Sequence, residues 1–236
     1  MQAIIMAAGR GKRMKGLCEE IPKPIMPVNG RCILEIILKQ LSLVGVKEAV
    51  IVVKYKKQKI IDKIGSERFG INIVYAEQKD IKGTGQAVLT AEPFIFDEKF
   101  YVIAGDSLFP TSVLTRLKDH PDADAVLTVC RVEDPSRFGV IETDDGRVTR
   151  IVEKSSNPPT NLANLSIYLF PKKIFDMCKR ISLSPRGEYE LTDAIQLLID
   201  QGGIVEYEVI EKGLDVGTPE QLKEAQELAK ELFEEI

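Results

Sequence analysis

Glycines and cations that suit phosphate binding follow directly on the first apolar run of the chain. The run leads into Ala7-Ala8-Gly9-Arg10-Gly11-Lys12-Arg13-Met14, and Lys23 then stands between Pro22 and Pro24. Glycines after a strand let the backbone approach a phosphate closely and point N–H groups at it. Because prolines restrict the backbone on both sides, the Lys23 ammonium is presented from a stiff segment. The stretch suits a triphosphate, since its loop carries the cations Arg10, Lys12, Arg13 and Lys15.

Two familiar phosphate loops do not fit this stretch. A Walker A loop requires Ser or Thr after Gly11-Lys12, where this chain has Arg13. A dinucleotide-binding fingerprint requires a third glycine at the position of Met14. A basic surface turn is the plain alternative, and it accounts for about half of isolated glycine-loop matches. The addition of Arg13 and the Pro-Lys-Pro segment makes a chance match much rarer.

Two acids stand where a cation could be held. Asp106 follows Ile103-Ala104-Gly105, at the carboxyl end of an expected strand, where open α/β sheets bind ligands. Asp215 lies in Leu214-Asp215-Val216-Gly217-Thr218. Mg²⁺ prefers oxygen ligands and usually takes one or two carboxylates together with substrate phosphates. Taken alone, each acid is more often a turn residue or a helix N-cap.

Composition excludes several classes of protein. The chain has 236 residues, a formal net charge of -4 and no apolar run of membrane-spanning length, so we expect neither nucleic acid nor a membrane as partner. The N-terminus lacks the layout of a signal peptide. Four scattered cysteines indicate a reducing compartment, which predicts a cytoplasmic protein. The single histidine, His120, excludes histidine-based triads and most zinc sites.

Short apolar runs alternate with amphipathic helical stretches, as in a doubly wound α/β sheet. Strands are expected over residues 2–7, 49–53, 71–76, 100–104, 123–129 and 165–170, and helices over 33–43, 58–64, 172–179, 191–200 and 220–234. Asp144-Asp145-Gly146 predicts a hairpin between strands at 140–142 and 148–152. We therefore expect a single domain over 1–236, with a nucleotide-binding lobe at 1–130 and a second lobe at 131–236 that adds antiparallel strands and a C-terminal helix.

The glycine loop resembles the signature of the sugar-1-phosphate nucleotidyltransferases (nucleotide-sugar pyrophosphorylases), G-x-G-T-R-[ML] followed by P-K. The matching residues are Gly9, Gly11, Arg13, Met14, Pro22 and Lys23, while Lys12 replaces the usual Thr. The resemblance continues through Glu77-Gln78 and Gly83-Thr84-Gly85, which are similar to the family's base-recognition segment, and through Gly105-Asp106. It extends to Phe138-Gly139, Val152-Glu153-Lys154 and the run Gly187-Glu188-Tyr189-Glu190-Leu191-Thr192-Asp193.

The resemblance implies a Rossmann-like mixed sheet, a sugar-phosphate lobe and a role for each matching residue. The implied catalytic residues are Arg13 and Lys23, and the nucleotide contacts are Ala8, Gly9, Gly11, Lys12, Gln78, Gly83 and Thr84. The implied sugar-phosphate contacts are Gly139, Glu153, Lys154 and Asn164, and the Mg²⁺ ligands are Asp106 and Asp215. Leu165-Ser166 stand where many members carry Thr-Gly, so we expect the sugar pocket to differ there. Thr192 and Asp193 are equally explained as caps of the following helix.

The expected reaction transfers a nucleotidyl group from a nucleoside triphosphate, with UTP or dTTP favoured, to a sugar-1-phosphate, with glucose-1-phosphate favoured. The acceptor phosphate is already an anionic nucleophile, so no general base is needed. One alternative is a cytidylyl- or guanylyltransferase for another phosphorylated acceptor. Another is a non-catalytic regulatory paralogue that binds nucleotide sugars. A metal-dependent glycosyltransferase would normally show Asp-x-Asp at the strand end. The sequence does not determine which sugar is the substrate or whether the chain forms a homo-oligomer. The chain ends after one helix, so the β-helix extension of many relatives is not expected.

Overall fold

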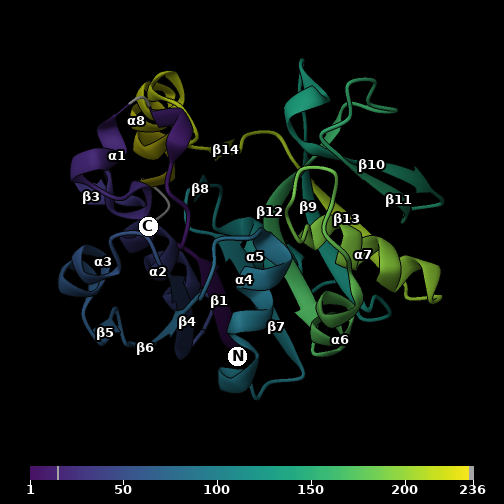
Figure 1. Cartoon of the computed structure of the whole chain (residues 1–236), viewed down its shortest axis with the longest axis horizontal. Coiled ribbons are helices and arrows are strands. Elements are labelled where there is room, and N and C mark those ends of the chain that lie inside the picture. Colours follow the sequence, from purple (N-terminus) through teal and green to yellow (C-terminus); the bar gives the residue numbers. More distant parts are fainter. Residues whose placement is uncertain (15, 234–236) are drawn as a thin grey trace.

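A ten-stranded mixed β-sheet runs through the computed structural model, which describes residues 1–14 and 16–233 (Figure 1). Its strand order is β10-β11-β13-β9-β12-β7-β1-β4-β6-β5. The parallel part consists of β1 (Gln2–Met6), β4 (Glu48–Val53), β6 (Ile71–Glu77) and β7 (Lys99–Ala104). The short strand β5 (Glu67–Arg68) pairs antiparallel with β6 at the edge. This arrangement confirms the predicted Rossmann-like half of the sheet.

The other half adds antiparallel strands, as the sequence predicts. The long strand β12 (Leu162–Pro171) runs antiparallel to both β7 and β9 (Ala125–Arg131). Strands β10 (Gly139–Asp144) and β11 (Arg147–Glu153) form the predicted hairpin, and its turn places Asp145 and Gly146 at φ of 45° and 76°. Both angles are positive, as the turn type favoured by Asp-Gly requires. Strand β13 (Val205–Ile210) pairs parallel with β9 and is absent from the sequence predictions.

Helices cover both faces of the sheet. One face carries α2 (Ile33–Leu43), α5 (Ser112–Arg116) and α8 (Pro219–Phe233), and the other carries α4 (Thr84–Thr90), α6 (Lys173–Arg180) and α7 (Leu191–Asp200). Alternation along β1 explains the two cores, because successive side chains of a strand point to opposite faces. Ala3 and Ile5 pack with Ile37 of α2, whereas Ile4 packs with Val88 of α4. Helix α3 (Lys57–Ile64) follows β4.

Two small two-stranded sheets and a short helix lie outside the ten-stranded sheet. Strands β2 (Pro27–Val28) and β3 (Arg31–Cys32) form a hairpin, and α1 (Leu17–Glu20) follows the glycine loop. Strand β8 (Ser107–Leu108) pairs with β14 (Leu214–Asp215). The helix expected over 220–234 begins at Pro219, and Glu234 lies outside the described residues. The lobe boundary at residue 130 stays a prediction. Within the described part of the chain, the helices lack the length and apolar character needed to cross a membrane.

Candidate active site

The glycine loop turns tightly beneath its cations. Gly11 has a φ of 63°, and a Cβ at this position would lie 2.3 Å from the Cys18 sulfur, so only glycine fits. The following turn buries Met14 against Cys18 and leaves Arg13 exposed. The loop thereby presents Arg13 toward the larger of the two cavities described below, while the backbone of Gly9 lines the smaller. Lys15, predicted as one of the loop's cations, lies outside the described residues.

Lys23 and Asp106 form an ion pair although they come from separate segments. The Lys23 side chain starts from a helical turn that follows Pro22, and its Nζ contacts the Asp106 carboxylate. Both side chains are largely buried, with 15% and 18% exposure. The structure therefore places the proline-flanked lysine directly on the acid at the end of β7.

Asp215 joins Asp106 because β14 pairs with β8. In this register Asp215 lies opposite Ser107, and Val216 N donates to the Asp106 carbonyl at 2.9 Å. The Ser107 hydroxyl donates to Asp215 Oδ1 at 2.6 Å. Burial and the negative charge of Asp106 raise the pKa of Asp215 to about 6. The two predicted acids thus lie close enough to repel one another.

A divalent cation fits this pair of acids. The described residues contain no group of three or more His, Cys, Asp or Glu side chains arranged to hold a metal. Two carboxylates are nevertheless what Mg²⁺ commonly takes from a protein when substrate phosphates supply the remaining ligands. A cation between Asp106 and Asp215 would also relieve the repulsion that raises the pKa of Asp215.

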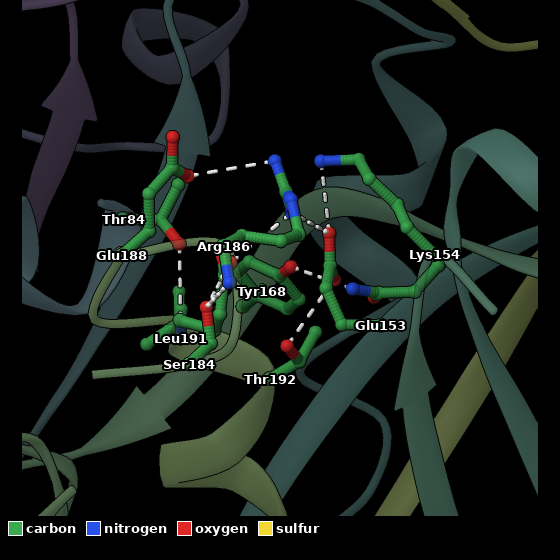
Figure 2. Close-up of polar contacts among 11 residues, drawn as sticks. Thr84, Glu153, Lys154, Tyr168, Ser184, Arg186, Glu188, Leu191 and Thr192 are labelled. Carbon is green, nitrogen blue, oxygen red and sulfur yellow. Dashed lines mark hydrogen bonds and ion pairs between the residues drawn. The ribbon is translucent and has the colours of Figure 1, made fainter. Parts of the chain in front are cut away.

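Glu153 is the centre of a polar network on the opposite side of the site (Figure 2). Its carboxylate contacts Lys154 Nζ at 2.9 Å and Arg186 Nη1 at 3.3 Å, and it accepts from the Thr192 hydroxyl at 3.2 Å. Gly139 faces the same carboxylate, because a Cβ there would lie 2.9 Å from Glu153 Oε2. The network fixes Glu153 with one oxygen toward two cations and the other toward Thr192.

Arg186 links Glu153 to two further acids. Figure 2 shows its guanidinium between Glu153 and Glu188, and the structure also pairs it with Glu190 at 3.1 Å. Burial and repulsion from Glu153 raise the pKa of both Glu190 and Asp193 above ordinary values. Several carboxylates therefore lie close together around Glu153. Arg186 forms ion pairs with three of them, those of Glu153, Glu188 and Glu190.

A row of polar side chains on β12 faces the same cavity. Asn164, Ser166 and Tyr168 alternate along the strand and all line it, so they share one face of the sheet. Asn164 is 7% exposed; its Nδ2 donates to the Tyr168 hydroxyl at 2.8 Å, and its Oδ1 has no partner. A buried, unpaired carbonyl oxygen in a cavity wall is suited to accept a hydrogen bond from a ligand hydroxyl.

Gln78, Gly83 and Thr84 lie together at the other end of the site. Gln78 is almost fully buried, and its Nε2 donates to the Gly83 carbonyl at 3.2 Å and to Gln86 Oε1 at 3.1 Å. Gly83 has a φ of 105°, and a Cβ there would lie 2.4 Å from the Tyr189 carbonyl oxygen. The Thr84 hydroxyl accepts from Leu191 N at 3.0 Å. These contacts join the loop before α4 to the segment before α7.

Two cavities meet at the Lys23–Asp106 pair. A cavity of about 490 Å³ is lined by Arg13, Asp106, Glu153, Lys154, Asn164 and Asp215, among others. A smaller one of about 230 Å³ is lined by Ala8, Gly9, Lys23, Gln78, Gly83 and Asp106, among others. Thr84, Asp106 and Glu188 line both. Two of the predicted residues line neither cavity. Lys12 lines a third, basic groove, and Gly11 forms the turn within the glycine loop.

Sequence reasoning assigns no role to Arg186 or Ser107. Arg186 directly precedes the recognised run that starts at Gly187, and its only signal is its charge beside that run. Ser107 follows the recognised Asp106, and its role depends on Asp215 from a distant strand. Thr192, which the sequence leaves open as a helix cap, instead donates from the first turn of α7 to Glu153.

Known proteins resemble this chain in sequence along nearly its whole length. The chain is 38% identical to the UTP–glucose-1-phosphate uridylyltransferase AglF of Haloferax volcanii, over 98% of this chain and 97% of that protein. It is 39% identical to the bifunctional protein GlmU of Methanocaldococcus jannaschii over 95% of this chain, but spans only 53% of that relative's length.

A solved structure has the same fold. This protein of Bacillus anthracis, assigned as a glucose-1-phosphate thymidylyltransferase and crystallised with sucrose, superposes with a TM-score of 0.87 at 27% identity, covering 98% of this chain and 95% of that one. The sequence model of the family described as nucleotidyl transferase matches residues 2–231. The chain therefore belongs to the nucleotidyl transferase family, as one of its sugar-1-phosphate nucleotidyltransferases.

Proposed function

We propose that the chain transfers a uridylyl or thymidylyl group from UTP or dTTP to glucose-1-phosphate, giving a nucleotide sugar and pyrophosphate. The observation that carries this proposal is the group Lys23, Asp106 and Asp215 at the junction of the two cavities. The names of AglF and of the Bacillus anthracis protein support glucose-1-phosphate as acceptor. The smaller cavity would hold the nucleoside, and the larger one the sugar phosphate.

The reaction proceeds by direct displacement at phosphorus. An oxygen of the sugar phosphate attacks the α-phosphorus in line, and a new P–O bond forms. The bond between the α-phosphorus and the bridging oxygen breaks, and pyrophosphate leaves with the electron pair. The chief obstacle is the approach of two anions, so positioning and charge neutralisation do most of the catalysis.

The cations Lys23, Arg13 and Lys154 neutralise the charges of different phosphates. Lys23 lies at the junction of the cavities and stabilises the charge that develops at the α-phosphate. Arg13 and the amides of the glycine loop hold the β and γ phosphates. Lys154 holds the incoming phosphate, and Glu153 and the free Asn164 Oδ1 accept from sugar hydroxyls. Arg186 keeps Glu153 in place.

Asp106 and Asp215 are the residues that would hold Mg²⁺. When bound, the ion supplies positive charge beside both reacting phosphates and lowers the repulsion between them. The Ser107 hydroxyl orients the Asp215 carboxylate for this role.

Gln78 favours uracil or thymine over cytosine. Because its Nε2 is occupied by Gly83 and Gln86, the amide oxygen is the part of Gln78 left to interact. An acceptor oxygen pairs with the N3–H group of uracil or thymine, whereas the corresponding nitrogen of cytosine carries no hydrogen. We further propose a cytoplasmic location, which the four free, buried cysteines support.

The decisive experiment measures pyrophosphate release with Mg²⁺ for UTP, dTTP, CTP, GTP and ATP, each crossed with several sugar-1-phosphates. We expect release with UTP or dTTP and strongest turnover with glucose-1-phosphate. Lys23→Ala serves as the matched inactive control. Release only with CTP or GTP would replace the proposal with the alternative transferases. Binding of nucleotide sugars without release from any pair would instead identify a regulatory paralogue.

A further inference from the structure

A third groove, distinct from the two cavities, concentrates positive charge beside the site. This basic groove has a volume of about 750 Å³ and is lined by the cations Arg10, Lys12, Lys54, Lys56, Lys79 and Lys82. The cations come from three separate segments: the glycine loop, the loop after β4 and the loop after β6. Among the residues that the structure describes, two acids line the same groove, Asp80 and Glu188. The excess of cations is notable because the chain as a whole has a net charge of -4.

The protein neutralises little of this charge. Arg10, Lys12 and Lys79 have no hydrogen-bond or ion-pair partner among residues 1–14 and 16–233. Lys54 contacts Glu77 at 3.2 Å, but Glu77 is exposed and shared with Lys57. Lys82 and Asp80 are 3.9 Å apart, and both are exposed. Exposed pairs of this kind are strongly screened, so the groove keeps a positive field.

The groove adjoins the proposed nucleotide cavity. Gly9, Ile81 and Glu188 line both of them, so the two meet at these residues. A polyphosphate in the groove would lie against the glycine loop, because Gly9, Arg10 and Lys12 line it. The lysines at 54, 56, 79 and 82 do not line the smaller cavity, so they lie outside the proposed binding site of the nucleoside.

We propose that the basic groove is the access route for the triphosphate, and that its field raises the association rate. This inference rests on the proposed function, since it takes a polyphosphate as the ligand. Steering by charged clefts raises association rates by about 10 to 10³-fold and weakens steeply with ionic strength. The Debye length falls from about 30 Å at 0.01 M salt to about 3 Å at 1 M, so added salt should abolish the effect.

The test uses Lys79→Glu, because Lys79 is exposed, unpaired and outside both cavities. The matched control is Lys173→Glu on α6, which is also exposed and shifts the net charge by the same two units. Association and dissociation rates of ribose-labelled fluorescent UTP are measured by stopped flow, without a sugar phosphate, at several salt concentrations. This readout needs no turnover, so it separates the groove from the proposed reaction.

We expect Lys79→Glu to slow association about 3- to 10-fold at roughly 20 mM salt and by less than about 1.5-fold at roughly 0.5 M. Its dissociation rate should equal that of the wild type, and Lys173→Glu should match the wild type throughout. Equal association rates for the two variants at every salt concentration would overturn the inference. A change confined to dissociation would overturn it too, since Lys79 would then contact the seated ligand. Normal association without pyrophosphate release would count against the proposed function alone.

Discussion

Lys23 reaches the junction of the two cavities from a segment stiffened by prolines. We predict that Lys23→Ala lowers kcat by about 10²- to 10³-fold with a much smaller change in KM, because its contact strengthens as charge develops at the α-phosphate. Steady-state kinetics at saturating Mg²⁺ measure both parameters. A variant with altered KM and unchanged kcat would show that Lys23 only binds substrate.

Ser107 holds the second acid of the site through one hydrogen bond of 2.6 Å. We expect Ser107→Ala to weaken Mn²⁺ binding about 10-fold, because groups that orient a metal ligand typically contribute 10- to 100-fold to affinity. Electron paramagnetic resonance of Mn²⁺ in the presence of UTP gives the affinity without turnover. Ser107→Thr keeps a hydroxyl and should restore binding. Equal Mn²⁺ affinity in the alanine variant would leave Ser107 without this role.

Gly217 leaves room for the guanidinium of Arg13. A Cβ at Gly217 would lie 2.9 Å from Arg13 Nη2, which is the far end of a flexible side chain. Gly217→Ala should therefore fold normally but displace Arg13 and lower kcat/KM for the triphosphate about 10-fold. In an Arg13→Ala background the same substitution should cost almost nothing, because the coupled pair is already broken. Additive losses in this double-mutant cycle would disprove the coupling.

At the level of secondary structure, strongly periodic segments are predicted well and short or interrupted ones are not. The apolar spacing of α2 predicts its bounds, Ile33–Leu43, and eight of its 11 residues are buried. Helix α4 is missed because it is short and contains Gly85, a poor helix former. Glycine suits this position, since a Cβ would crowd the Ile181 side chain at 2.9 Å and the Tyr189 carbonyl oxygen at 3.1 Å. The spacing of residues near Gly85 in the sequence cannot predict contacts with residues so far along the chain.

Two glutamates on one face of strand β13 bind the single histidine of the chain. His120 contacts Glu206 through Nδ1 at 2.5 Å and Glu208 through Nε2 at 2.8 Å, and Arg116 contacts Glu208 at 2.9 Å. Burial alone would lower the pKa of His120, but the hydrogen bonds to both carboxylates outweigh it and raise the pKa above its ordinary value. Both ring nitrogens then act as donors.

Stability should therefore depend on His120 in a defined pH range. A raised folded-state pKa contributes stability that is complete below the unfolded value of about 6.5 and is lost as the pH rises through the folded value. We expect His120→Ala to reduce the free energy of unfolding by about 1–2 kcal/mol at pH 5.5 and by less at pH 9. Because the chain has one histidine, an NMR titration reads its pKa directly. A value at or below about 6.5 would contradict the prediction.

Across the whole molecule, the sequence predicts the fold class but not the assembly of the site. Alternating strands and helices suffice for a doubly wound sheet, because each element must bury one face. The meeting of Asp106 with Asp215 depends instead on the pairing of β8 with β14, two strands of two residues each. Strands so short carry no periodic signal. The resemblance to a family, rather than local patterning, therefore identifies Asp215.

The pairing of β8 with β14 joins residues 108 positions apart and has a consequence for folding kinetics. Contacts between distant parts of a chain form slowly, because closing the long loop between them costs entropy before the contact contributes any favourable free energy. Strand β1 pairs with β4 and β7, which both lie in the first half of the chain, whereas Asp215 needs the chain up to β14 in place. During refolding from denaturant, we expect circular dichroism to recover before turnover does. Simultaneous recovery of both signals would show that the acid pair forms with the sheet.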